Sequence, residues 1–128
     1  GGGFQSLVAE TGLRDSDADV RVLCLHQLIE GARVGVQDFT FRRARDVIPT
    51  RALPRGVAAV LSGHIHRGQL LSRDLFGRRL VAPVIYPGST ERTSLDERLE
   101  RKGYVRLELA PGGAGGRLVD ARFEMLLP

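Results

Sequence analysis

Three histidines are the residues of this 128-residue chain whose types and spacing best suit metal or phosphoryl chemistry. His26 follows a short apolar run, and His64 and His66 belong to a Gly-His-Ile-His element after a second apolar run. Residues at positions i and i+2 of an extended chain point to the same side. Neutral imidazole is a good ligand for zinc, manganese, iron or nickel, so these side chains are candidate metal ligands. The simpler interpretation of each histidine taken alone is a polar residue in a turn.

Two β-rich runs, residues 20–25 and 57–61, are expected to position these histidines. Both runs are apolar at successive positions, which predicts strands of an α/β sheet that are buried on both faces. Cys24 lies in the first run and is predicted to be a core residue. Ligands of α/β sheets collect outside the carboxyl ends of the strands. We therefore expect the histidines to converge at that edge of the sheet.

The remaining elements are expected to be one helix, several strands and a long loop. Apolar residues recur at helical spacing over residues 4–11, and Gly12 is a plausible end of that helix. Residues 30–46 lack a clean period and are predicted to form a long loop, followed by a helical turn at 48–53. The segment 96–102 is predicted to be either loop or one helical turn. Further strands are predicted at residues 69–71, 80–82, 104–109 and 117–127, and residues 84–86 lead into the turn at 87–89.

Four short motifs follow one another within residues 20–110. They are Leu25-His26-Gln27, Gly63-His64-Ile65-His66, Tyr86-Pro87-Gly88-Ser89-Thr90-Glu91-Arg92 and Lys102-Gly103-Tyr104. Their order resembles the C-terminal half of calcineurin-like metallophosphoesterases. The last two motifs are most similar to the DNA-repair exonuclease branch of that family, the SbcD-like nucleases.

The resemblance implies a fold, a metal centre and a reaction. The implied α/β fold is a partial metallophosphoesterase β-sandwich, half of the αββα four-layer core, with a mixed sheet and long loops. The family pattern places His26 and His64 on one metal and His66 on the other. Two divalent ions are implied, with manganese expected and zinc or iron as alternatives. In such enzymes a hydroxide that bridges the metals attacks phosphorus, and the ions neutralise charge on the phosphoryl oxygens.

Three further residues are candidates for contact with the substrate phosphate. Arg67 adjoins the histidine pair, while Ser89 and Arg92 belong to the third motif. A guanidinium binds phosphate oxygens through two parallel hydrogen bonds. The alternatives are a solvated surface position for Arg67 and a structural role for the Pro-Gly turn. Glu97 is expected to join neighbouring charges in a solvated ion-pair network.

The chain departs from the family pattern in its metal ligands. The DxH, GD and GNH motifs of the family's N-terminal half do not occur, and the sequence contains no Asn. Two ions need roughly eight to twelve donor atoms, which three neutral imidazoles cannot supply. We therefore expect a C-terminal piece of a longer enzyme that is inactive alone and exposes a strand edge and apolar surface. Its expected parts are residues 1–19 (helix and connection), 20–110 (phosphoesterase half) and 111–128 (hairpin strand or start of a capping region).

The composition of the chain narrows the binding partners and the cellular compartment that we expect. No apolar run approaches the roughly 18 residues of a membrane span. One cysteine excludes an internal disulfide, so a cytoplasmic location is expected. Residues 33–79 hold ten Arg against three Asp, although the chain's net charge is only +4. Such a segment suits DNA, or is an ordinary arginine-rich surface.

Three functions stay open on the sequence. The favoured one is a DNA-repair-type exonuclease, for which an SbcC-like ATPase is a candidate partner beside the missing N-terminal half. The first alternative is a phosphodiesterase or phosphatase of the same fold that acts on small molecules. The second alternative is a degenerate module that keeps the fold without catalysis.

Overall fold

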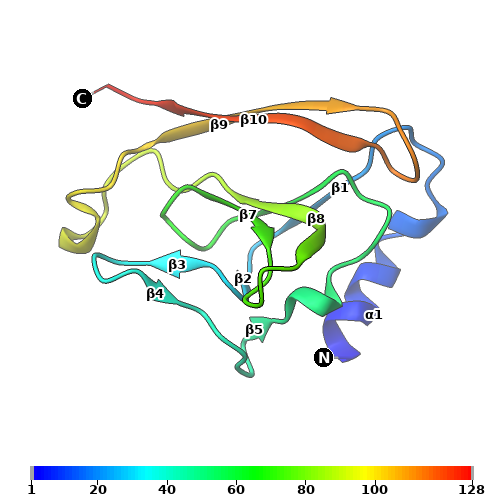
Figure 1. Ribbon diagram of the computed structural model, residues 1–128, viewed down its shortest axis with the longest axis horizontal. Helices are drawn as coiled ribbons and strands as arrows, with labels where there is room; N and C mark the ends of the chain where they lie inside the picture. The colour runs from blue at the N-terminus through cyan, green and yellow to red at the C-terminus, as the bar shows by residue number, and fades with distance from the viewer. Residues whose placement is uncertain (1, 128) are drawn as a thin grey trace.

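The computed structural model describes residues 2–127 and is a mixed α/β structure, built mostly of strands in open sheets (Figure 1). Its largest sheet has the strand order β1-β6-β8-β7. β1 (Val22–Leu25), β6 (Ala59–Ser62) and β8 (Arg79–Tyr86) are parallel, and β7 (Gln69–Arg73) is antiparallel to β8. The expected mixed sheet is therefore present. Its core is centred on β6 and β8, where Val60, Val84 and Tyr86 are fully buried.

The outer strand β1 corrects one expectation about burial. Leu23 is 5% exposed, whereas the next residue, Cys24, is exposed, so the prediction of a strand buried on both faces with Cys24 in the core is wrong. Successive side chains of a strand point to opposite faces, and only one face of β1 packs on the core. Within residues 2–127, β1 pairs with β6 alone, which leaves the expected open strand edge. Leu7, 62% exposed, lines the same surface hollow as Cys24 and adds exposed apolar surface.

β8 extends beyond the strand predicted at residues 80–82 and includes residues 84–86. β8 contains Pro83, which cannot donate a hydrogen bond to a neighbouring strand. In the structure the register between β7 and β8 shifts between Leu71 and Arg73, opposite the stretch that contains Pro83. This irregularity accommodates the missing donor, so β8 continues through the proline.

The segment predicted as a long loop contains one short strand pair, and the two strands of a second pair flank it. β3 (Arg33–Val34) pairs antiparallel with β4 (Phe39–Thr40), and β2 (Leu28–Ile29) pairs parallel with β5 (Val47–Ile48). The predicted loop at 30–46 is therefore wrong in part, because pairs of two residues are too short to show a sequence period. The expected helical turn is present but shorter, as a 3₁₀ turn, η2 (Thr50–Ala52).

The expected N-terminal helix is confirmed as α1 (Gly2–Glu10), followed by the 3₁₀ turn η1 (Leu13–Asp15). Gly12 ends the helix with φ 71°, a left-handed conformation that favours glycine. Val8 is buried and packs the helix on the core. No helix among residues 2–127 is long and apolar enough to cross a membrane.

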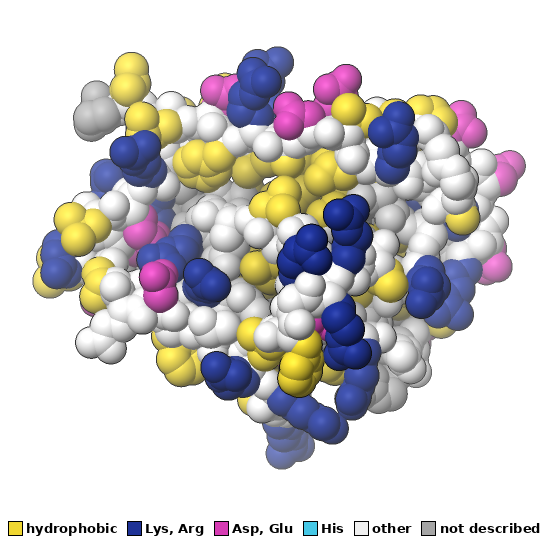
Figure 2. All heavy atoms as spheres, in the orientation of Figure 1, with side chains coloured by type: hydrophobic (Ala, Val, Ile, Leu, Met, Phe, Trp, Pro, Cys, Tyr) yellow, Lys and Arg dark blue, Asp and Glu magenta, His cyan; other side chains and the backbone are white. Residues whose placement is uncertain are grey.

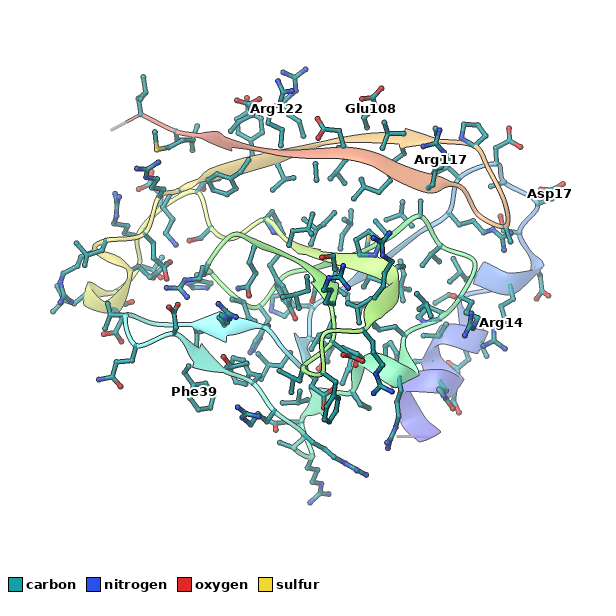
Figure 3. The ribbon with its side chains drawn as sticks, viewed as in Figure 1. Arg14, Asp17, Phe39, Glu108, Arg117 and Arg122 are labelled. Atoms are coloured by element: carbon teal, nitrogen blue, oxygen red, sulfur yellow. The ribbon has the colours of Figure 1, made fainter. Side chains whose placement is uncertain are left out.

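The expected C-terminal hairpin is confirmed as an antiparallel ribbon of β9 (Gly103–Ala110) and β10 (Arg117–Met125). The ribbon runs above the four-stranded sheet in Figure 1. Glu108 and Arg122 point away from the sheet, as Figure 3 shows. On the inner side, the ring of Phe123 lies against Gly68, where a Cβ would collide with it. The 3₁₀ turn η3 (Leu95–Glu97) precedes the ribbon, within the segment where the sequence left loop and helical turn open.

Candidate metal and phosphate site

His26 and His64 come together at one edge of the sheet. β1 and β6 are parallel and in register, with Leu25 opposite Ser62, so the chain leaves both strands at the same edge. The two imidazole ring centroids lie 5.2 Å apart with an interplanar angle of 89°. Both side chains are exposed to solvent. The expectation that histidines from neighbouring strand ends converge is confirmed for this pair.

Gly63 makes this approach of the two rings sterically feasible. A Cβ at Gly63 would lie 2.8 Å from the Nδ1 atom of His26, closer than van der Waals contact allows. The next residue, His64, has φ 80°, a left-handed backbone that a residue with a side chain rarely adopts. Such conformations cost free energy and persist only where the surrounding structure holds them in place. They are found most often at functional sites. The backbone at residues 63 and 64 is thus shaped around the imidazole pair.

His66 has different neighbours. Its Nδ1 atom lies 3.2 Å from the Thr93 hydroxyl oxygen and 3.4 Å from the Oε1 atom of Glu97. His64 and His66 line a common cavity of about 330 Å³, to which Glu97 and Glu100 also contribute. Among residues 2–127, however, no group of three or more His, Cys, Asp or Glu side chains is arranged to hold a metal ion. The structure therefore brings two of the three predicted ligands together and places the third beside a carboxylate.

Glu97 and Lys102 form a buried ion pair next to His66. The Lys102 Nζ atom lies 2.7 Å from Glu97 Oε1 and 2.9 Å from Glu100 Oε2, and it donates a hydrogen bond to the His66 carbonyl (2.8 Å). Glu97 is only 6% exposed, so the expected solvated network is wrong at this residue. The hydrogen bond from Lys102, and then the hydroxyl of Thr93, hold the pKa of Glu97 far below its usual 4.5. We call Glu97, Lys102 and Thr93 the charged knot.

The charged knot gives Lys102 of the Lys-Gly-Tyr motif a structural role. It ties the start of β9 to the backbone of the Gly-His-Ile-His element through the bond from Lys102 to His66. The sequence alone did not predict a structural role for Lys102. An available signal was that Lys102 is the only lysine among nineteen basic residues. A lysine ammonium is a compact charge with three donors, which suits three acceptors converging from different directions.

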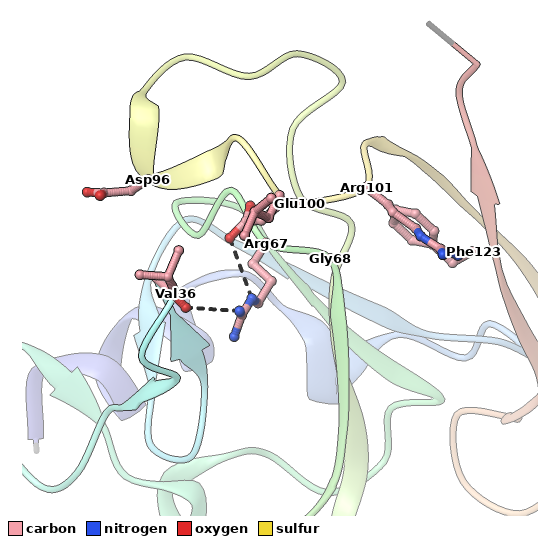
Figure 4. Close-up of a pocket in the computed structure, with 9 residues that line it drawn as sticks. Val36, Arg67, Gly68, Asp96, Glu100, Arg101 and Phe123 are labelled. Carbon is pink, nitrogen blue, oxygen red and sulfur yellow. Dashed lines mark hydrogen bonds and ion pairs between the residues drawn. The ribbon is translucent and has the colours of Figure 1, made fainter.

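Arg67 is engaged by neighbouring acidic and carbonyl groups. It pairs with Asp38, donates to the Gly35 carbonyl (2.9 Å) and lies 3.5 Å from Glu100 Oε1. Figure 4 shows its guanidinium between Glu100 and the turn that joins β3 to β4. Arg67 lines a hollow of about 410 Å³. A phosphate at this position would therefore compete with two carboxylates for the guanidinium.

Ser89 and Arg92 hydrogen-bond within their own part of the chain. The Ser89 hydroxyl lies 2.7 Å from the Glu91 carbonyl and 3.2 Å from Glu97 Oε1, and the Arg92 guanidinium donates to the Glu100 carbonyl (2.7 Å). The Ser89 backbone N–H also donates to the His66 carbonyl (3.0 Å). The structure thus places Ser89 beside the histidine element, while a role in phosphate binding stays a prediction for both residues.

Tyr86 is a structural residue of the site that sequence reasoning did not single out. It is completely buried, and its hydroxyl donates to the Gln27 carbonyl (2.8 Å) and accepts from the Ile29 N–H (2.9 Å). Burial raises the pKa of this phenol above its usual value. The Ser62 hydroxyl donates to the same Gln27 carbonyl (2.9 Å). These bonds fix the position of the chain immediately after His26, and the signal was a polar tyrosine ending an apolar strand.

The donor set fits part of a metal site and not a complete bimetallic centre. Two exposed imidazoles converge, which is a suitable pair of ligands for one divalent ion. In the described residues no carboxylate joins them to balance the charge of an ion. The remaining ligands of a two-metal centre would have to come from outside the described residues.

A scan of the sequence against protein-family models finds no matching family, and no curated protein matches it.

Proposed function

We propose that these residues are the C-terminal part of a dimetal phosphoesterase domain, one half of its β-sandwich. The observation that carries this proposal is the convergence of His26 and His64 at the ends of the parallel strands β1 and β6. Parallel sheets bind ligands at that edge. The strained backbone of His64 supports a functional role for the same edge.

The chain by itself should not hydrolyse phosphodiesters. A two-metal centre requires roughly eight to twelve donors with carboxylates among them, and this edge offers two converging imidazoles. His26 and His64 would supply the neutral ligands of one ion, and His66 would serve the other through Nε2, since its Nδ1 faces Thr93 and Glu97. The favoured substrate of the complete enzyme is DNA, because residues 33–79 carry a strong excess of arginine.

Metal titration of the 128-residue chain tests this proposal. We expect weak Zn²⁺ or Mn²⁺ binding by calorimetry that is lost in His26→Gln and in His64→Gln. His66→Gln is the matched control and should retain that binding, because His66 contacts Thr93 and Glu97 through Nδ1 and does not join the His26–His64 pair in a three-ligand group of the described residues. Binding that all three variants leave unchanged would overturn the assignment of the pair as ligands.

An activity measurement tests the other half of the proposal. The chain with Mn²⁺ should leave both single-stranded and duplex DNA intact. Hydrolysis that is abolished by His64→Gln would show that the chain holds a complete metal centre. It would contradict the proposal that the remaining ligands lie outside the described residues. An upstream reading frame with the DxH, GD and GNH motifs would supply the missing carboxylates and place the chain in a longer enzyme.

A further inference from the structure

A second polar surface lies at the opposite end of the four-stranded sheet from the histidines. Tyr86 of β8 pairs with Gln69 at the histidine end, whereas Arg79 pairs with Arg73 beside the β7–β8 turn. That turn meets the segments that flank β5 around a hollow of about 560 Å³. We call the arginines of this hollow the arginine face: Arg42, Arg43, Arg51, Arg78 and Arg79. Figure 2 shows Lys and Arg side chains gathered over this part of the molecule.

The charges of the arginine face are mostly unpaired. The hollow contains two carboxylates, Glu30 and Asp74. Asp74 pairs with Arg78 (3.1 Å), and Glu30 accepts a hydrogen bond from the Thr50 hydroxyl (3.2 Å). Within the described residues the other four arginines have no ion-pair partner, whereas Arg67 has two carboxylate neighbours. Guanidinium groups stay charged at any physiological pH, so their mutual repulsion is relieved only by an anion.

An exposed aromatic ring projects beside these charges. Phe76 lies in the β7–β8 turn and is 82% exposed. The Arg78 guanidinium carbon lies 5.2 Å from the centre of its ring, which leaves the rest of the ring open to solvent. Asp74 accepts backbone hydrogen bonds from Phe76 and Arg78 (both 2.9 Å), so the turn that presents the ring is ordered. Guanidiniums for phosphates and an aromatic ring for a base are the two components of single-strand binding sites.

We infer that the arginine face binds single-stranded nucleic acid, with phosphates among Arg42, Arg43, Arg51 and Arg79 and a base stacked on Phe76. A duplex would bring its phosphates to the same guanidiniums, but its stacked bases would leave Phe76 unused. This inference does not depend on the metal assignment, because none of these residues is a candidate metal ligand, but it uses arginines of the same segment, residues 33–79, that favours DNA as the substrate.

Binding of a fluorescent thymidine 20-mer in EDTA, over a range of salt concentrations, tests the inference. Arg43→Gln combined with Arg51→Gln should lower the slope of log affinity against log salt by about 1 to 1.5, since each phosphate contact on a single strand contributes roughly 0.7. Phe76→Ala should weaken single-strand binding roughly fivefold or more and leave duplex binding unchanged. The matched control is Arg106→Gln with Arg122→Gln on the ribbon, which removes the same charge from exposed positions.

Several outcomes would overturn the inference. An equal loss of affinity in the ribbon control would show that net charge alone attracts the oligonucleotide. Equal affinity for duplex and single strand, with no effect of Phe76→Ala, would contradict the stacking of a base on Phe76. Binding to vesicles rich in phosphatidylserine without oligonucleotide binding would assign the face to a lipid surface. Because EDTA removes divalent metal ions, none of these results bears on the proposed metal ligands. Those ligands are tested by the metal titration alone.

Discussion

The two ends of the four-stranded sheet hold their charges in opposite ways. At the histidine end, the ammonium of Lys102 is buried and surrounded by Glu97, Glu100 and a backbone carbonyl. At the far end, Arg43 and Arg51 are exposed and have no ion-pair partner among the described residues. A buried charge requires partners because desolvation is costly, whereas an exposed arginine does not. The first arrangement is therefore expected to contribute to folding, and the second to remain available for a ligand.

Removing the lysine of the charged knot should have the largest effect on stability. Lys102→Met leaves Glu97 without its cation and Glu100 with Arg67 alone, and breaking a buried pair in this way costs about 3–5 kcal/mol. Urea denaturation would measure the fall in the free energy of unfolding. Arg98→Met is the control, because Arg98 is an exposed cation of the same segment and should change stability by no more than about 0.5 kcal/mol. Equal changes in the free energy of unfolding for the two variants would contradict a stabilising role of the charged knot.

Acid should weaken the same end of the sheet. The pKa of Glu97 is held well below its usual 4.5, chiefly by Lys102, so its carboxylate stabilises the fold at pH values above 4.5. That stability is lost as the pH falls below 4.5 towards the folded-state pKa. Unfolding measured from about pH 6 to about pH 3 should show this loss. Lys102→Met should make the free energy of unfolding depend less steeply on pH. An unchanged slope would show that Glu97 is not the group responsible for the pH dependence.

The part of the fold that was predictable from the sequence is the part set by local pattern. The period-two alternation of residues 104–109 predicted β9, and helical spacing with Gly12 predicted α1. Exposure of Cys24 was not predictable, because it depends on only one face of β1 being covered by the rest of the fold, which the apolar sequence of the strand does not show. Convergence of His26 and His64 followed from parallel strand order, whereas the neighbours of His66 depend on a segment distant in sequence. By sequence Phe76 is an ordinary turn residue, because its exposure and its arginine neighbours depend on the fold.

Loss of one buried hydroxyl should have the next largest effect on stability. Tyr86→Phe removes a donor to Gln27 and leaves the buried N–H of Ile29 without an acceptor, at a cost of about 1–3 kcal/mol. Thermal or urea unfolding measures this loss. Tyr104→Phe is the matched control, because Tyr104 is half exposed on the ribbon and its change should be near zero. If neither variant changed the free energy of unfolding, the hydrogen bonds of Tyr86 would not be needed to hold the chain after His26 in place.

The strained backbone at the histidine edge predicts a small gain in stability from glycine. His64→Gly removes the penalty of a side chain at φ 80°, and we expect the free energy of unfolding to rise by about 0.5–1 kcal/mol. His66→Gly is the control of opposite sign, since it loses the contacts with Thr93 and Glu97 and gains chain entropy when unfolded. Destabilisation by both variants would mean that the His64 ring itself, through His26, stabilises the edge.

The arginine face should show the smallest effect on folding. Arg43→Gln with Arg51→Gln removes two exposed charges that have no ion-pair partner among the described residues, so the free energy of unfolding should change by no more than about 0.5 kcal/mol. At low salt the sign should be a slight gain, because like charges repel, and the gain should vanish at high salt. Urea unfolding at two salt concentrations measures both. A loss above about 1 kcal/mol would show that these guanidiniums hold the fold together like Lys102, and the contrast between the two ends of the sheet would disappear.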